Sequence, residues 1–190
     1  MSGRSLSTMS EPPAPAPLLR AQLPVAEYAD FYAGYVAAVP ADETIDDALA
    51  GSLRDITAWL DGLPPARGDY AYAPGKWTVA QSLQHVLDTE RIFTFRALSF
   101  ARGERAPLPG FHQDAYAAAA PATGRTLTDL ADELRAVRAA TRMLFASFDA
   151  EALARAGTMS DVVVSCRALG FVIAGHCYHH AAVFRERYTG

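Results

Sequence analysis

The stretch TVAQSLQHVLDTERIFTFRALSFAR, from Thr78 to Arg102, predicts one long helix. It begins with a recognisable start signal, because Gln81 follows Thr78 at the spacing of a capping box. No proline or glycine interrupts the stretch before Gly103, and glycine commonly follows the end of a helix. Helices of this length are typical of helical bundles.

Four further helices are predicted, separated by proline and glycine. Their expected ranges are 25–39, 46–63, 126–148 and 164–187. Apolar residues three or four positions apart, such as Leu49, Leu53 and Ile56, form a stripe that a helix would bury. No segment has a strand pattern of useful length. The sequence therefore predicts an all-α fold, an antiparallel four-helix bundle with an additional N-terminal helix.

The two ends of the chain differ in composition. Residues 1–22 are rich in Ser, Pro and Ala, and we predict a disordered tail there, in which Met9 is an alternative start. Residues 23–190 are expected to form one bundle domain. Between the helices, 104–124 carries Pro107, Pro109 and Pro121 and is predicted to be a long irregular loop, a kind of segment that is often functional.

Charge and composition exclude several classes of protein. The net charge is -4 and there is no basic run, which argues against nucleic-acid binding. No stretch has the ~18 to 20 consecutive apolar residues of a membrane span. The 2 cysteines do not suggest a disulfide framework, so a reducing compartment fits best. We therefore expect a cytoplasmic protein with no nucleic-acid or membrane partner.

The motif GHCYHH, from Gly175 to His180, contains two histidines at helical i, i+4 spacing. His176 and His180 would lie one turn apart on one helix face, where they can chelate a single metal ion. Their stripe continues in Val172 and Val183 and is otherwise apolar. Burying an unpaired imidazole costs on the order of 1 to 3 kcal/mol, a penalty that a shared metal removes. By spacing alone, surface or hydrogen-bonded core histidines are an equal alternative.

His85 is the third candidate ligand, in the middle of the long helix. Its one-turn neighbours Ser82, Asp88 and Thr89 form a polar level that suggests an inward-facing site, as helical bundles build them. Taken alone, His85 fits a hydrogen-bonded core histidine better, but the pair on the last helix favours a joint site. Three imidazoles leave a coordination position open, the mark of a catalytic site. Zinc or nickel suits this ligand set best, and iron or manganese is also compatible.

Other polar residues have weaker assignments. Asp88 either orients His85 or is a solvated acid. His179 is predicted to point to the side of the pair, and His112 to be an exposed loop residue with no catalytic part. The cysteines, Cys166 and Cys177, are expected to be small packing residues rather than ligands.

Three segments resemble the DinB/YfiT-like superfamily. They are YAPGKWTVAQSLQHVLDTERIFTFRAL, RGERAPLPGFHQDAYA and GHCYHHAAVFRERY, and the likeness extends roughly from Ile45 to Tyr188. The resemblance implies an antiparallel four-helix bundle whose metal ligands are His85, His176 and His180. One departure is His112 in FHQDAY, where similar members commonly have an acidic residue.

The resemblance also implies a range of functions. Members of the superfamily include thiol S-transferases that use bacillithiol or mycothiol, and many are dimers. We therefore expect a small-molecule substrate, a homodimer and, as cofactors, a divalent metal ion and a low-molecular-weight thiol. The alternatives are a metal-assisted hydrolase, disfavoured because no Glu stands beside the histidine pair as a base, and a non-enzymatic metal- or ligand-binding stress protein.

Overall fold

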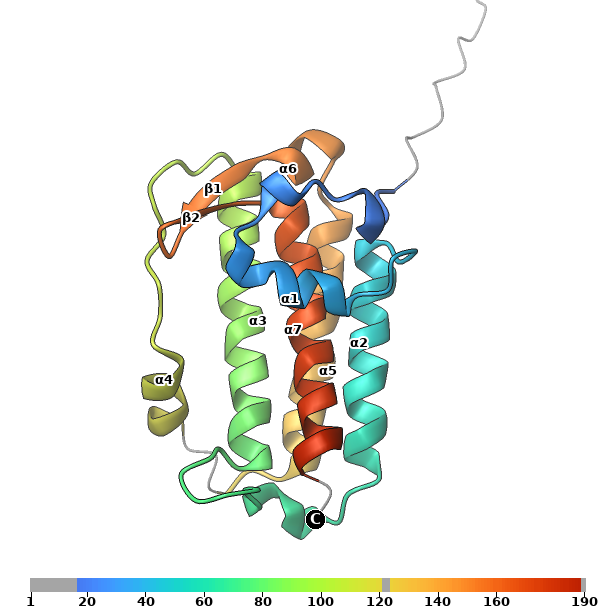
Figure 1. The fold of residues 1–190 in the computed structure, drawn as a ribbon, viewed down its shortest axis with the longest axis vertical. Coiled ribbons are helices and arrows are strands. Elements are labelled where there is room, and N and C mark those ends of the chain that lie inside the picture. Colours follow the sequence, from blue (N-terminus) through green and yellow to red (C-terminus); the bar gives the residue numbers. More distant parts are fainter. Residues whose placement is uncertain (1–16, 121–123, 189–190) are drawn as a thin grey trace, which may run out of the picture.

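The structure, a computed structural model, describes residues 17–120 and 124–188. Four long helices form a bundle in which α7 packs against α2 and α3, and α5 packs against the other side of both (Figure 1). Their bounds are Ile45–Asp61 for α2, Val79–Ala101 for α3, Leu127–Ala146 for α5 and Cys166–Arg187 for α7. The predicted all-α bundle is confirmed. None of the described helices is long and apolar enough to cross a membrane.

The connection from α3 to α5 sets the topology of the bundle. It descends along the outside of α3, so that α3 and α5 run in the same direction and opposite to α2 and α7 (Figure 1). Antiparallel packing therefore holds for α3 with α7 and for α2 with α5. The predicted irregular loop 104–124 contains a short helix, α4 (Gln113–Ala119), which packs on α3. Its 7 residues make only about two turns, too few to show a period in the sequence.

Capping boxes begin three of the four long helices. At α3 the hydroxyl of Thr78 accepts a hydrogen bond from the Gln81 amide at 3.1 Å, and the Gln81 side chain accepts one from the Thr78 amide at 2.9 Å. The predicted box is therefore confirmed. Thr44 and Thr126 form the same arrangement at the starts of α2 and α5. These caps satisfy amides that a helix start leaves without partners.

The N-terminal part of the described chain differs from the prediction. The single helix expected over 25–39 is two elements, a 3-10 turn η2 (Val25–Glu27) and α1 (Asp30–Ala38), separated by the extended residue Tyr28. Residues 1–16 of the predicted tail lie outside the described residues. The rest of it is packed, because Leu18 contacts the core and Leu19 forms a β-bridge with Thr44. The 3-10 turn η1 (Arg20–Gln22) follows.

A small hairpin at the end of the bundle was not predicted. After α6 (Ala150–Ala154), β1 (Ala156–Met159) pairs with β2 (Val162–Ser165) in antiparallel register. The connecting residues Ser160 and Asp161 both have positive φ, 48° and 65°, as a tight two-residue hairpin turn requires. The expectation of no strands was wrong because each strand has only 4 residues and their turn lacks the glycine that usually marks one.

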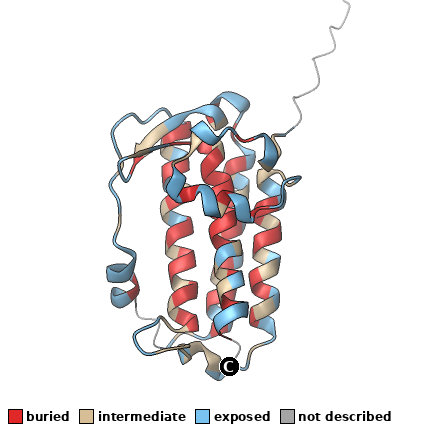
Figure 2. Cartoon of the chain, viewed as in Figure 1, coloured by how far each residue is buried: buried red, intermediate tan, exposed pale blue. Residues whose placement is uncertain are grey.

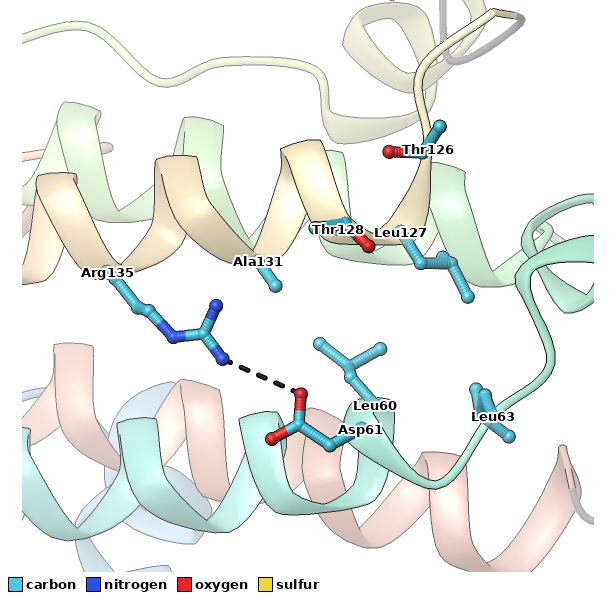
Figure 3. Close-up of a pocket in the computed structure, with 8 residues that line it drawn as sticks. All are labelled: Leu60, Asp61, Leu63, Thr126, Leu127, Thr128, Ala131 and Arg135. Atoms are coloured by element: carbon cyan, nitrogen blue, oxygen red, sulfur yellow. Dashed lines mark ion pairs between the residues drawn. The ribbon is translucent and has the colours of Figure 1, made fainter.

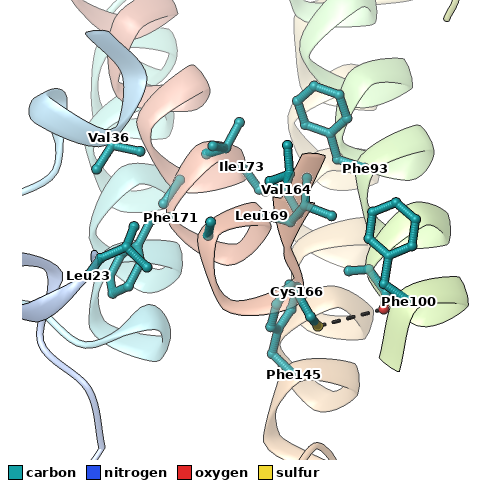
Figure 4. Packing of buried hydrophobic residues seen from close by; sticks show 14 of the residues in the cluster. Leu23, Val36, Phe93, Phe100, Phe145, Val164, Cys166, Leu169, Phe171 and Ile173 are labelled. Carbon is teal, nitrogen blue, oxygen red and sulfur yellow. Dashed lines mark hydrogen bonds between the residues drawn. The ribbon is translucent and has the colours of Figure 1, made fainter. Parts of the chain in front are cut away.

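The buried side chains line the inner faces of the four long helices (Figure 2). Near the hairpin end, Phe93 and Phe100 of α3 pack with Leu169 of α7, and the Cys166 thiol lies 3.6 Å from the Ala97 carbonyl oxygen (Figure 4). A second apolar cluster fills the other end of the bundle. Together these clusters hold α3 and α7 side by side, and the histidines lie on those two helices.

Candidate metal centre

His85, His176 and His180 come together between α3 and α7. One ring nitrogen from each lies within 4.8 Å of the others, and the Nε2 atoms of His85 and His176 are 3.1 Å apart. His85 and His176 are buried, and His180 is half-buried. Among the described residues this is the single group of histidines, cysteines and acids with such geometry. Residues 91 positions apart in the sequence thus form one cluster.

The geometry fits a divalent metal ion. Two imidazole nitrogens bound at about 2.0 Å to a tetrahedral zinc ion lie about 3.3 Å from each other, close to the observed 3.1 Å. His176 and His180 are one helical turn apart, with ring centroids separated by 4.6 Å. His85 faces both of them from α3, and its ring centroid lies 5.0 Å from that of His176 and 5.1 Å from that of His180. That these three residues bind a metal stays a prediction, and the arrangement of their nitrogens suits it.

The electrostatics keep the three imidazoles uncharged. Burial lowers the pKa of His85 to about 4 and that of His180 to about 3. Burial also lowers the pKa of His176 well below its usual value, and the neighbouring imidazoles lower it further. A histidine must be neutral to offer a lone pair to a metal. The cluster is therefore in its metal-binding form at neutral pH.

Thr89 and Trp77 hold His85 in place. The Thr89 hydroxyl lies 3.5 Å from Nδ1 of His85, on the side of the ring opposite to the nitrogen that faces His176. Trp77 packs against the His85 ring with centroids 4.9 Å apart. Asp88, for which orienting His85 was one of two predicted roles, instead accepts a hydrogen bond of 2.9 Å from the Gln84 side-chain amide. The hydroxyl, rather than the acid, lies beside the His85 ring.

Helix α1 covers the centre from the α7 side. The Tyr35 ring makes edge contacts with His176 and His179, with centroids 5.3 and 5.5 Å apart. This close approach depends on Gly175, because a Cβ at that position would lie 1.9 Å from the Tyr35 carbonyl oxygen. Tyr35 was not predicted, because no periodic signal in α1 points to it.

The remaining predicted residues lie outside the cluster. His179 is exposed beside Tyr35, and His112 is exposed at the residue before α4. Both cysteines are buried, as expected of packing residues. The Cys177 thiol lies 3.4 Å from the Ser52 carbonyl oxygen, and burial raises the pKa of Cys166 to about 12.

A buried ion pair lies next to the centre and was also missed. The guanidinium of Arg138 on α5 is fully buried and donates two hydrogen bonds of 2.8 Å to the carboxylate of Glu90 on α3. It also donates to the Ser52 hydroxyl at 2.8 Å and to the Leu49 carbonyl oxygen on α2. One side chain therefore ties three helices together at the level of Cys177, the neighbour of His176.

Among the hollows on the surface of the described residues are two that lie between helices. The smaller, about 190 Å³, lies between α2 and α5, where Arg135 and Asp61 form an ion pair of 3.6 Å (Figure 3). None of the three clustered histidines lines it. The larger, about 590 Å³, is a groove between α3 and α4 lined by Gln84 and Asp88, which flank His85 in sequence. We call it the α3–α4 groove.

Comparison with known proteins supports these observations. The model of the DinB superfamily matches residues 48–184. A similar solved structure is YfiT from Bacillus subtilis, described as "a probable metal-dependent hydrolase with an unusual four-helix bundle topology". It is 14% identical with a TM-score of 0.68, over 75% of this chain and 82% of that chain. At that identity the likeness concerns the fold. No curated protein matches the sequence.

Proposed function

This chain belongs to the DinB superfamily, as its sequence segments predicted, and from that premise we propose that it is a metal-dependent thiol S-transferase acting on electrophilic small molecules. The observation that carries the proposal is the convergence of three neutral imidazoles between α3 and α7. Three neutral ligands leave the charge of a divalent ion uncompensated and a coordination position open, which is typical of catalytic sites.

The ligand set favours a thiol as the nucleophile. A divalent ion held by the three imidazoles would stabilise a bound thiol as its thiolate. A free thiol has a pKa of about 8.5, against about 15.7 for water, so a thiol needs far less help from a base. Among the described residues, no carboxylate joins the three imidazoles in their cluster. A site with a strong positive charge and no carboxylate within the cluster suits thiol activation better than water activation.

The surrounding side chains would serve that reaction. Thr89 and Trp77 fix His85, while Tyr35 shields His176, so the imidazoles need little reorganisation and the nucleophile meets little water. The thiolate sulfur would form a bond to an electrophilic carbon, whose leaving group departs with its electron pair. The thiol proton goes to solvent.

Metal-assisted hydrolysis is the second candidate, and Asp114 favours it. This exposed residue in the first turn of α4 is close enough to His85 for its charge to raise the pKa of that histidine, against the larger lowering by burial. An acid near the centre is a candidate general base for a water molecule. The description of YfiT as a probable hydrolase agrees with this alternative.

Two assays with the metal-loaded protein separate the candidates. The first follows conjugation of cysteine with chlorodinitrobenzene, and the second follows hydrolysis of nitrophenyl acetate without thiol. We expect conjugation that is lost in His85→Ala and retained in Asp114→Asn. Ester hydrolysis lost in Asp114→Asn, without conjugation, would instead favour the hydrolase. His179→Ala serves as the matched control, because His179 lies on α7 next to His180 but outside the cluster.

A further inference from the structure

The α3–α4 groove has the size and lining of a small-molecule site. Its volume of about 590 Å³ lies in the range of roughly 300 to 1,000 Å³ usual for ligand pockets. Its lining includes apolar side chains, Ile92 on α3 and Tyr116 on α4. Its polar groups come from α3 and from the residue before the N-cap of α5: Gln84, Asp88, Arg91 and Arg125. Such a lining suits a short polar molecule with an apolar stem.

Two guanidinium groups of the groove converge on one carboxylate, that of Glu133. Arg91 donates to one oxygen of Glu133 at 2.5 Å, and Arg125 donates to the other oxygen. Arg125 also donates to the Gln84 side-chain oxygen at 2.7 Å. Two positive charges thus share one carboxylate. The guanidinium fork matches a carboxylate in shape and charge, and Glu133 shows that both side chains already turn toward one.

Arg91 keeps donors for a second carboxylate. Its side chain is 47% exposed, and its single hydrogen bond within the described residues uses one terminal nitrogen. The Nε and second terminal groups therefore have no protein acceptor in the described part of the chain. A surface staple between α3 and α5 would need only one arginine. The second arginine and the unused donors leave the pair able to bind an anionic ligand as well.

No clustered histidine lines the groove, but Gln84 and Asp88, which do, lie within one helical turn of His85 on α3. Arg91 follows His85 by six residues, which is about 9 Å along a helix axis. Asp88 lies between them, its carboxylate held by Gln84. An anion therefore belongs at the Arg91 end, and the stretch that passes Asp88 belongs to neutral or hydrogen-bond-donating groups. A molecule with a carboxylate at one end and a metal-binding group at the other fits this order of charges.

We propose that the α3–α4 groove binds the thiol substrate through a carboxylate, which Arg91 and Arg125 hold while the sulfur reaches the histidines. This inference rests on the proposed thiol chemistry for the sulfur end, whereas the carboxylate end stands on the groove alone. The thiol would be a small carboxylate-bearing molecule whose two functional groups lie about 9 Å apart along the helix.

The first test uses three simple thiols with the metal-loaded protein: mercaptohexanoate, mercaptohexanol and mercaptoacetate. Binding is followed by the thiolate-to-metal absorption band of the nickel-loaded protein. We expect mercaptohexanoate to bind about tenfold more tightly than the uncharged mercaptohexanol, the usual gain from a charge-assisted hydrogen bond. Mercaptoacetate, too short to reach Arg91, should bind no better than mercaptohexanol.

Arginine variants locate the effect. Arg91→Gln should abolish the preference for mercaptohexanoate and leave the binding of mercaptohexanol unchanged. Arg135→Gln is the matched control, because Arg135 is also ion-paired and 42% exposed but lies at the α2–α5 hollow. The preference should persist in this variant. Equal binding of the two long thiols by the wild type, or equal weakening of both by Arg91→Gln, would overturn the proposal and leave the arginines as a structural staple.

A second test works without metal or thiol. Hexanoate and hexanol are titrated into the metal-free protein, and amide shifts are followed by nuclear magnetic resonance. Hexanoate alone should shift the amides of Gln84 and Ala119 in the groove, and Arg91→Gln should remove those shifts. This result would support the carboxylate site even if no thiol transfer is found. Absence of shifts, together with normal thiol binding at the metal, would refute the groove and leave the proposed function intact.

Discussion

Substituting Gly175 by alanine tests how α1 is fitted over the metal centre. The residue precedes His176 on α7, and its missing side chain is what lets the Tyr35 carbonyl approach. A Cβ there would lie 1.9 Å from that oxygen, whereas ordinary contact begins at 3.4 Å. The difference, 3.4 minus 1.9, means that α1 must move away by about 1.5 Å. The Tyr35 ring would then lose its edge contact with His176.

The expected cost follows from two opposing effects. Overpacking a close contact of this kind costs roughly 1 to 3 kcal/mol. Replacing glycine by alanine inside a helix returns up to about 1 kcal/mol. Because the obstructing atom belongs to the backbone rather than to a flexible side chain, we expect the upper part of the range, a net loss of about 2 kcal/mol. For a domain of this size, that lowers the melting temperature by roughly 4 to 8 °C.

Gly34→Ala is the matched control. Gly34 lies in α1 itself, and a Cβ there would meet nothing within 4 Å. We expect it to raise stability by about 0.5 to 1 kcal/mol through reduced backbone freedom. Urea unfolding of the three proteins, with a chelator competition titration for zinc, measures both effects. Gly175→Ala should lose stability and zinc affinity together. A Gly175→Ala protein as stable as Gly34→Ala would refute the close approach of α1 to α7.

Three further perturbations address the layers around the centre. Arg138→Met should destabilise the protein by about 3 to 5 kcal/mol in urea unfolding, because Glu90 is left buried without its partner; the double variant with Glu90→Leu should recover much of that loss, and no recovery would contradict the pairing. Thr89→Val should weaken zinc binding about tenfold with little change in the unfolding free energy, since it removes the hydroxyl beside His85; unchanged affinity would exclude a positioning role. The free energy of unfolding of the metal-free protein should be at its maximum above about pH 6.5 and fall as the pH decreases. The reason is that the unfolded chain takes up protons on these histidines, whereas the folded pKa values are about 4 for His85 and about 3 for His180. Unfolding curves at stepped pH, compared with those of His85→Phe, should show the decline continue to about pH 3 to 4 in the wild type, and an equally steep decline in the variant would contradict the assignment to His85.

The long helices and the histidine cluster were accessible to sequence reasoning because both depend on local periodicity. A capping box at Thr78 marks the start of α3. The i, i+4 spacing of His176 and His180 places two imidazoles on one face of α7 whatever the rest of the chain does. The third candidate ligand, His85, was reached because a polar level on a buried helix indicates an inward-facing site. Each of these signals lies within one helix.

The parts that were missed depend on contacts between distant segments. Tyr35 reaches His176 only because Gly175 admits the α1 backbone, and neither residue has a local signal for that contact. Arg138 resembles any surface arginine in the sequence, although its partner Glu90 lies 48 residues away and both are buried. The hairpin and α4 are too short for a period to appear. Tertiary packing decided these features, and a single sequence does not record it.

Metal content tests the central claim most directly. The protein, purified without a histidine tag, is measured by elemental mass spectrometry beside His176→Ala/His180→Ala, with His179→Ala as the control on the same helix. A single site of three imidazoles predicts about one equivalent of zinc or nickel per chain in the wild type and in His179→Ala. The double variant should contain none. If the wild-type protein takes up no zinc, nickel, iron or manganese when each is offered, metal binding at this site is refuted. The three histidines would then be structural.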